Sequence, residues 1–301
     1  MARSTPKYST VLVTSCNGYI GSHVDQLLEA GYRVRTTRNI TKIQRLAASW
    51  EKKYGAGRFE VITVEDMAVG GAFDEAVKGV SGIAHVASVL TFDPDPDEVI
   101  PTALAGVRGI LKSAAREPSV KRFVYTSSST AATAPIHNKE FHIDSNIWNE
   151  ADIRAAHAPG PIKPERAWPV YGASKTEAEN LVWQFVKEEN PQFVVNAVLP
   201  NTNFGRLLDP KLPASTRDFP RNLFRGEKQN LPPQYYIDIQ DTARLHVAGL
   251  TIPDVKNERL FAFATPFNWN NVLRIMRKLR PDHQFIDDYE DDNLRDQSSG
   301  E

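Results

Sequence analysis

The stretch VTSCNGYIGSH, from Val13 to His23, decides how the N-terminal part of this sequence folds. It overlaps the end of an apolar run, TVLVT at residues 10–14, which is typical of a buried parallel strand. It leads into GSHVDQLLEAG at residues 21–31, where apolar residues recur at helical spacing. A strand, a glycine-bearing turn and a helix in this order form a pyrophosphate site, because the helix N-terminus offers free N–H groups and a positive dipole end.

The residues of this turn have distinct tasks in such a site. Gly18 lets the backbone approach the phosphates, Gly21 lets the helix pack closely against the strand, and Asn17 tolerates a left-handed conformation. Ser15 stands where the first glycine is expected, and a positive φ there would cost of order 1–2 kcal/mol. We therefore expect a working but weakened dinucleotide site. The alternative is that Asn17 and Gly18 only make a tight turn.

Strands and helices alternate from this turn to residue 200, which implies βαβ units and a parallel sheet. The sequence therefore predicts an α/β fold of the Rossmann type, a doubly wound parallel sheet with helices on both faces. The further strands are expected at residues 32–37, 58–64, 82–88, 122–127 and 193–200, and the helices at 72–80, 97–116 and 171–189.

The alternation is interrupted twice. Residues 130–170 are rich in His, Pro and Asn and weakly periodic, as insertions that carry function often are. After residue 203 the sequence is irregular, with helices expected at 239–252 and 271–280 and a disordered polar tail from Asp287. We expect a dinucleotide-binding core of residues 1–203, to which 236–262 return, and a small interleaved C-terminal substrate-binding lobe of residues 204–235 and 263–301.

The composition limits the classes of partner. The 301 residues carry a formal net charge of -1, with a pI near 6.7, so neither nucleic acid nor an anionic membrane is favoured. A single cysteine, Cys16, points to a reducing compartment. A polar start and the absence of a long apolar run indicate a cytoplasmic protein. The seven histidines show no metal-ligand spacing, so no metal is expected, and monomer and homodimer both stay open.

The end of the second predicted strand indicates the cofactor. NAD sites carry an acid about 20 residues beyond the glycines, whereas NADP sites favour arginine. The segment from Gly31 to Trp50 holds no acid, and Arg38 lies at the strand's carboxyl end, 20 residues past Gly18. We expect Arg38, helped by Lys42, to bind the 2′-phosphate of NADP(H). The alternative is a solvated basic start of a helix.

A second group of residues points to proton transfer. Tyr171 and Lys175 are spaced i, i+4 at the start of a predicted helix, so they share a face. A nearby ammonium would lower the pKa of the tyrosine, which could then donate a proton to a carbonyl oxygen as hydride arrives. The hydroxyl-rich run YTSSST at residues 125–130 ends a strand at the same sheet edge and can hydrogen-bond the substrate oxygen.

Together these segments resemble the extended short-chain dehydrogenase/reductase family, within the NAD-dependent epimerase/dehydratase superfamily. The resemblance is to the branch with dihydroflavonol 4-reductase and the fungal aldehyde and ketone reductases, and it spans roughly residues 8–265. The matching segments are VTSCNGYIGSHV, GYRVRTTRN, VEDM, GIAHVAS, RFVYTSSSTAA, YGASKTEAE, VLPNTNFG and YYIDIQDTARLHVAGL.

The resemblance implies roles for individual residues. Ser128 would be the catalytic serine, Tyr171 the proton donor, and Lys175 the residue that lowers the tyrosine's pKa and binds the nicotinamide ribose. Asp66 and Met67 would flank the adenine, Ala87 and Ser88 would line the cleft, and Pro200 and Asn203 would lie beside the nicotinamide. The expected cofactor contacts are Ser15, Asn17, Gly18, Tyr19, Ile20, Gly21, Arg38, Lys42, Asp66, Met67, Ala87, Ser88, Thr126, Tyr171, Lys175, Pro200 and Asn203.

The leading functional prediction is an NADPH-dependent carbonyl reductase that converts an aldehyde or ketone, apolar or aromatic, to an alcohol. Two alternatives stay open. One is a non-redox epimerase or lyase on the same scaffold, although nucleotide-sugar epimerases usually carry an acid where this chain has Arg38. The other is a dinucleotide-sensing regulator without catalysis, although such proteins have typically lost the tyrosine and lysine that this chain keeps.

Overall fold

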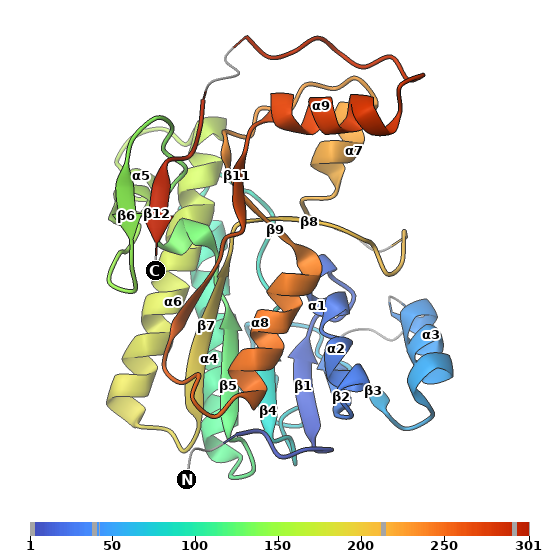
Figure 1. Cartoon of the computed structure of the whole chain (residues 1–301). Helices are drawn as coiled ribbons and strands as arrows, with labels where there is room; N and C mark the ends of the chain where they lie inside the picture. Colours follow the sequence, from blue (N-terminus) through green and yellow to red (C-terminus); the bar gives the residue numbers. More distant parts are fainter. Residues whose placement is uncertain (1–3, 38–40, 42, 212–214, 291–293, 301) are drawn as a thin grey trace.

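The computed structural model describes residues 4–37, 41, 43–211, 215–290 and 294–300. Its main sheet has seven parallel strands in the order β10-β7-β5-β4-β1-β2-β3, with the first strand near the centre (Figure 1). This is the strand order of the Rossmann fold, so the predicted fold class is confirmed. The strands are β1 Thr10–Thr14, β2 Arg33–Thr37, β3 Phe59–Ile62, β4 Gly82–His85, β5 Arg122–Thr126, β7 Val194–Pro200 and β10 Arg259–Ala262.

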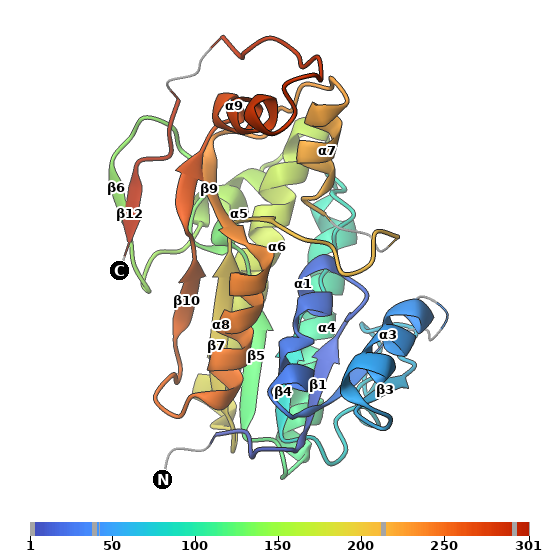
Figure 2. The ribbon, with the colours of Figure 1, turned by 45° about the vertical axis from the view of Figure 1, so that its right-hand side comes forward.

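Alternating side chains of the central strand β1 bind the two helical layers to the sheet. Leu12 joins the core on the α4 and α6 face, and Val11 and Val13 join the core on the other face. All three side chains are fully buried, as expected for a strand covered on both sides. Figures 1 and 2 show α8 and α1 over one face and α4 and α6 over the other. The helices are α1 Tyr19–His23, α2 Gln26–Glu29, α3 Gln44–Tyr54, α4 Pro96–Arg116, α6 Ala167–Glu189 and α8 Ile239–Thr251.

The late segments of the chain build a second, smaller layer. A three-stranded sheet in the order β11-β9-β8 carries two short helices, which lie at the top of Figure 1. Phe204, Leu223, Phe267, Trp269 and Leu273 pack together there in a separate apolar cluster. The elements are β8 Thr202–Phe204, α7 Asp218–Phe224, β9 Gln234–Asp238, β11 Thr265–Phe267 and α9 Trp269–Leu279.

Two helices differ from the prediction. The expected helix at 21–31 is split into α1 and α2, and Ser22 Oγ donates to the Tyr19 carbonyl, a local bond that competes with regular helix geometry. Residues 72–80 form successive turns, with Gly71 and Gly79 at positive φ and mostly i→i−3 bonds. The side chains predicted to share a face there are buried nevertheless: Phe73, Ala76, Val77 and Val80.

The insertion and the tail are more ordered than predicted. Residues 129–166 contain four short elements, and the tail beyond Asp287 includes the strand β12, so the expectation of disorder is wrong for residues 294–300. β12 pairs in parallel with β6, and Tyr235 Oη donates to the Ser298 carbonyl at 2.7 Å. Composition cannot reveal a pairing partner 157 residues away. The elements are η2 Ser129–Ala131, β6 Phe141–Ile143, α5 Glu150–Ala156, η3 Pro164–Arg166 and β12 Ser298–Gly300.

Candidate active site

The glycine turn between β1 and α1 has the tight geometry that a phosphate site requires. Ser15 adopts φ +59°, and its carbonyl accepts the Gly18 N–H at 2.9 Å. A Cβ on Gly21 would lie 2.9 Å from the Ser15 carbonyl carbon, so only glycine fits there. The left-handed residue is therefore Ser15 and not Asn17 among the described residues. Ser15 therefore carries the left-handed strain that the sequence led us to expect at this position.

Two buried polar side chains near the turn have oxygens without a protein partner among the described residues. Asn17 and Thr37 are almost fully buried, and neither Asn17 Oδ1 nor Thr37 Oγ1 has a hydrogen-bond partner among the described residues. Buried polar atoms are normally satisfied, so both atoms fit a site that is completed by a polar ligand. Tyr19 and Ile20, at the start of α1, pack their side chains against Ile239.

The thiol in the turn is a packing residue. Burial raises the pKa of Cys16 to about 12, so the thiol stays protonated. Its backbone N–H donates to Thr36 Oγ1 at 3.2 Å, which ties the turn to β2.

The basic residues in β2 and just after it divide into two groups. Arg38 and Lys42, the predicted 2′-phosphate ligands, lie outside the described residues. Arg35 donates to Glu60 Oε1 and to two backbone carbonyls, and Arg45 pairs with Asp209 at 3.2 Å. The described arginines Arg35 and Arg45 thus have protein partners in this structure.

An open cleft with about 820 Å³ of empty space runs along the carboxyl edge of the sheet. It brings together five of the predicted cofactor residues: Asp66, Met67, Ala87, Ser88 and Lys175. Ser128, Tyr171, Pro200 and Asn203 are not part of its lining. An elongated ligand along the sheet edge would have to extend from this cleft towards them.

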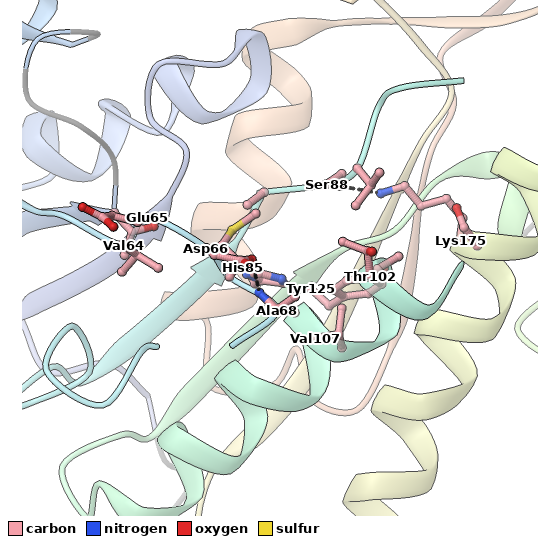
Figure 3. A pocket seen from close by; sticks show the side chains of 17 residues that line it. Val64, Glu65, Asp66, Ala68, His85, Ser88, Thr102, Val107, Tyr125 and Lys175 are labelled. Atoms are coloured by element: carbon pink, nitrogen blue, oxygen red, sulfur yellow. Dashed lines mark hydrogen bonds between the residues drawn. The ribbon is translucent and has the colours of Figure 1, made fainter. Parts of the chain in front are cut away.

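Lys175 is the charged group of the cleft. Its Nζ donates to Ser88 Oγ at 2.7 Å and to the Thr126 carbonyl at 3.2 Å, and Figure 3 shows the first bond from α6 to the segment after β4. Burial lowers the pKa of Lys175 to about 8, while the nearby Glu179 carboxylate acts in the opposite direction.

Tyr171 and Ser128 meet beside Lys175. Burial raises the pKa of Tyr171, and a hydrogen bond with the Ser128 side chain opposes this shift. The role expected of Lys175 towards Tyr171 stays a prediction; in this structure its ammonium donates to Ser88 and to the Thr126 carbonyl. Ser128 Oγ also accepts from Thr130 N at 3.2 Å and from Thr130 Oγ1 at 2.9 Å. Helix α6 begins four residues before Tyr171, so the i, i+4 pair lies within the helix.

The comparisons with known proteins agree with this arrangement. A model of the NAD dependent epimerase/dehydratase family matches residues 11–258. The chain belongs to this family. It is 44% identical over 294 residues to Aldehyde reductase 2 of Sporidiobolus salmonicolor, which covers 95% of this chain and 85% of that protein. It is 40% identical over 289 residues to Ketoreductase adrE of Penicillium rubens, with 93% and 83% covered.

Solved structures of this epimerase/dehydratase type share the fold. Vestitone reductase from alfalfa is 26% identical, with a TM-score of 0.72 and with 92% of this chain and 84% of that chain covered. Yeast methylglyoxal/isovaleraldehyde reductase Gre2, solved with NADPH, is 24% identical, with a TM-score of 0.82 and with 97% and 90% covered. The resemblance to the dihydroflavonol 4-reductase-like branch is thereby confirmed.

Sequence reasoning missed two buried histidines that support the carboxyl edge of the main sheet. Thr14 Oγ1 accepts the N–H groups of Val86 and Ala87 at 2.9 Å, so its proton goes to His85 Nδ1. Burial, and secondarily the Lys175 charge, lowers the pKa of His85 to about 3, so the ring stays neutral. A hydroxyl at a strand end followed by a histidine in the neighbouring strand is too common a pattern to have identified this pair.

Helix α8 holds two further predicted cofactor contacts, Thr126 and Asn203. His246 Nδ1 can only donate to the Thr242 carbonyl, at 2.8 Å, so its Nε2 accepts from Thr126 Oγ1 at 2.7 Å. Thr242 Oγ1 donates to Asn203 Oδ1 at 2.6 Å. Thr126 and Asn203 are thus both held from one helix face. Pro200 is buried at the end of β7, next to Ala262 of β10.

An aromatic group borders Tyr171. The ring centroids of Phe92 and Tyr171 are 5.0 Å apart, and Trp168 meets both rings. Phe92 holds φ +51°, a strained conformation for a bulky residue, and Trp168 is 49% exposed. Tyr236 and Phe204 pack in the second lobe's apolar cluster.

The described part of the chain lacks two kinds of feature. None of its helices combines the length and the apolar character that a bilayer span requires. Its His, Cys, Asp and Glu side chains form no group of three that could hold a metal ion.

Proposed function

We propose that this protein is an NADPH-dependent reductase that converts an aldehyde or ketone to an alcohol. The contact between the Ser128 and Tyr171 side chains, with Lys175 one helical turn further along α6, carries the proposal. The names of the relatives, an aldehyde reductase and a ketoreductase, support it. Such a reaction needs a proton donor and a hydrogen-bond donor at one oxygen, and these two hydroxyls provide both.

In this mechanism, bound NADPH supplies the hydride. Ser128 donates a hydrogen bond to the substrate oxygen, and Tyr171 transfers its proton to that oxygen as negative charge develops there. Lys175, as the ammonium, stabilises the resulting phenolate until a proton from solvent restores the hydroxyl. One hydride and one proton added to the carbonyl give the alcohol.

We further propose which residues hold the cofactor. The turn of Ser15, Asn17, Gly18 and Gly21 faces the pyrophosphate, and Thr37 Oγ1, which has no partner among the described residues, can donate to a phosphate oxygen there. Arg38 and Lys42 bind the 2′-phosphate. Replacement Arg38→Ala should then lower the ratio of NADPH to NADH affinity at least ten-fold, measured by fluorescence titration. An unchanged ratio would refute this assignment. The remaining proposed contacts are Tyr19, Ile20, Asp66, Met67, Ala87, Ser88, Thr126, Tyr171, Lys175, Pro200 and Asn203.

We propose an apolar or aromatic substrate, because Phe92 and Trp168 stand beside Tyr171. The lobe that binds it comprises residues 204–235 and 263–301, whereas 1–203 and 236–262 form the cofactor-binding core. Strand β10 and helix α8, which contact the main sheet, support this division.

A non-redox reaction is the second candidate, since a 39% identical relative from Aspergillus terreus is named NAD-dependent epimerase/dehydratase terH. One assay separates the two: NADPH consumption with aromatic aldehydes, β-keto esters and diketones, with Tyr171→Phe as the control. We expect turnover that falls by about 10²–10⁴-fold in Tyr171→Phe with NADPH binding retained. NADPH binding without turnover of any carbonyl would instead favour the non-redox reaction.

A further inference from the structure

A buried ion pair lies one helical turn beyond Lys175 on α6. Arg259 of β10 donates from Nε to Glu179 Oε1 at 2.7 Å and from Nη2 to Oε2 at 3.4 Å. Glu179 is fully buried, and the Arg259 side chain is 4% exposed. Two charges removed from water need complete hydrogen bonding to be tolerated, so the partners of this pair matter.

Those partners belong to the end of β5, to α6 and to the insertion after residue 128. Glu179 also accepts from Ser127 Oγ at 2.6 Å and from Trp183 Nε1 at 3.1 Å. Arg259 Nη1 donates to the Ile147 carbonyl at 2.6 Å, and its guanidinium lies 3.9 Å from the centre of the Trp148 ring. The ion pair therefore joins the end of β5 to the insertion that follows the catalytic serine.

The insertion returns to the catalytic serine two residues further on. Asn149 Nδ2 donates to the Thr130 carbonyl at 2.8 Å, and Asn149 N donates to the Ala131 carbonyl at 3.1 Å. Thr130 in turn donates from N and Oγ1 to Ser128 Oγ. A continuous path of contacts thus leads from Ser127, through Glu179 and Arg259, to the residues just after Ser128.

We propose that Glu179, together with Arg259, is a positioning residue that fixes Ser128 against Tyr171 and sets the residue 145–149 segment of the insertion. The inference deepens the proposed reductase function and rests on it. Neither charged side chain touches the reacting atoms. Their effect passes through the Ser127 hydroxyl on one side and the Asn149 amide on the other, so misplacement of Ser128 lowers the rate of the chemical step.

The smallest test removes one contact. Ser127→Ala takes away the hydroxyl that donates to Glu179 and leaves the ion pair in place. We expect kcat to fall about ten-fold, with KM and the Kd for NADPH within about two-fold of the wild type. Ser113→Ala is the matched control, because Ser113 also donates to a carboxylate at 2.6 Å, that of Asp74, away from the site. A kcat for Ser127→Ala equal to that of the control would overturn the proposal.

A second test separates positioning from stability. Arg259→Met alone leaves a buried carboxylate unpaired and should lower the Tm strongly. Combining it with Glu179→Gln removes both charges and should restore most of the Tm, while kcat stays at least about ten-fold low. Recovery of kcat together with the Tm would show that the pair serves stability alone and would refute the positioning role.

Amide hydrogen exchange provides a readout that does not depend on turnover. In Ser127→Ala we expect faster exchange in residues 127–133 and 145–149, but not along the rest of α6. Unchanged exchange in both segments would contradict the path of contacts. Faster exchange in a protein that reduces no carbonyl would preserve the path and reject only the reductase function.

Discussion

Ser15 and Gly21 interlock: a side chain on Gly21 would begin 2.9 Å from the Ser15 carbonyl carbon. The left-handed Ser15 turns its carbonyl towards the first turn of α1, where it also accepts the Gly18 N–H. The turn therefore requires both a positive φ at Ser15 and a residue without a side chain at position 21.

Replacement Gly21→Ala should disrupt this turn. The added methyl group would overlap the Ser15 carbonyl, so we expect a loss of about 1–3 kcal/mol in the free energy of unfolding and weaker NADPH binding. Gly109→Ala in α4 is the control, because its Cβ would meet its nearest atom at 3.7 Å. Thermal unfolding and NADPH titration of both variants check this; equal behaviour would contradict the overlap.

Replacement Ser15→Gly should stabilise the protein rather than tighten NADPH binding. Glycine relieves about 1–2 kcal/mol of left-handed strain but loses about 0.5–1 kcal/mol of chain entropy, so the net gain is at most about 1.5 kcal/mol. Asn190→Gly serves as the control, since asparagine already tolerates its φ of +41°. A Kd for NADPH that drops ten-fold in Ser15→Gly would show that strain enters on binding after all.

The rate of reduction should depend on the protonation of Lys175. The pKa of Lys175 is lowered to about 8, so the ammonium is present below that pH and is lost as the pH rises through it. We expect kcat/KM to fall above about pH 8, because this ratio reports ionisations of the free enzyme. Lys175→Arg keeps the charge and should retain its residual activity at higher pH; an identical alkaline limb in both proteins would exclude Lys175 as its source.

Ser88 should tune that same ionisation. Its hydroxyl accepts from the Lys175 ammonium at 2.7 Å and thereby favours the charged form. Ser88→Ala should shift the alkaline limb of kcat/KM to lower pH, and Ser88→Thr, which keeps a hydroxyl, should restore it. The pH profiles of the three proteins provide the measurement, and an unshifted limb in Ser88→Ala would show that the bond has no influence on the pKa.

The sequence predicted the parts of the fold that depend on local pattern. Buried strands such as β1 and long helices such as α6 can be recognised from the spacing of their apolar residues. The turn chemistry at Gly18 and Gly21 likewise indicated that a helix follows, although α1 begins at Tyr19, two residues before the predicted start. The short turns at 72–80 were mistaken for a helix, because the burial of Phe73 and Val77 follows the same spacing while the backbone follows the glycines.

The sequence predicted which residues gather at the candidate site, but not which partners hold them there. Motif spacing identified Tyr171 and Lys175 as a pair, and the family resemblance added Ser128, but neither could show where the Lys175 ammonium points. The partners of the site, such as Glu179 with Arg259 or Thr126 with His246, are 80 and 120 residues apart in the chain. Long-range hydrogen bonds of this kind leave no periodic signal in a single sequence.

The pairing of β12 with β6 has a consequence for the order in which this protein forms during synthesis. The main sheet is complete once residue 262 has left the ribosome, so the cofactor half can fold while the chain is still growing. Residues 141–143, by contrast, find their partner strand only when residues 298–300 emerge. We therefore expect nascent chains to bind a dinucleotide before the side of the protein that receives the substrate has acquired its final shape.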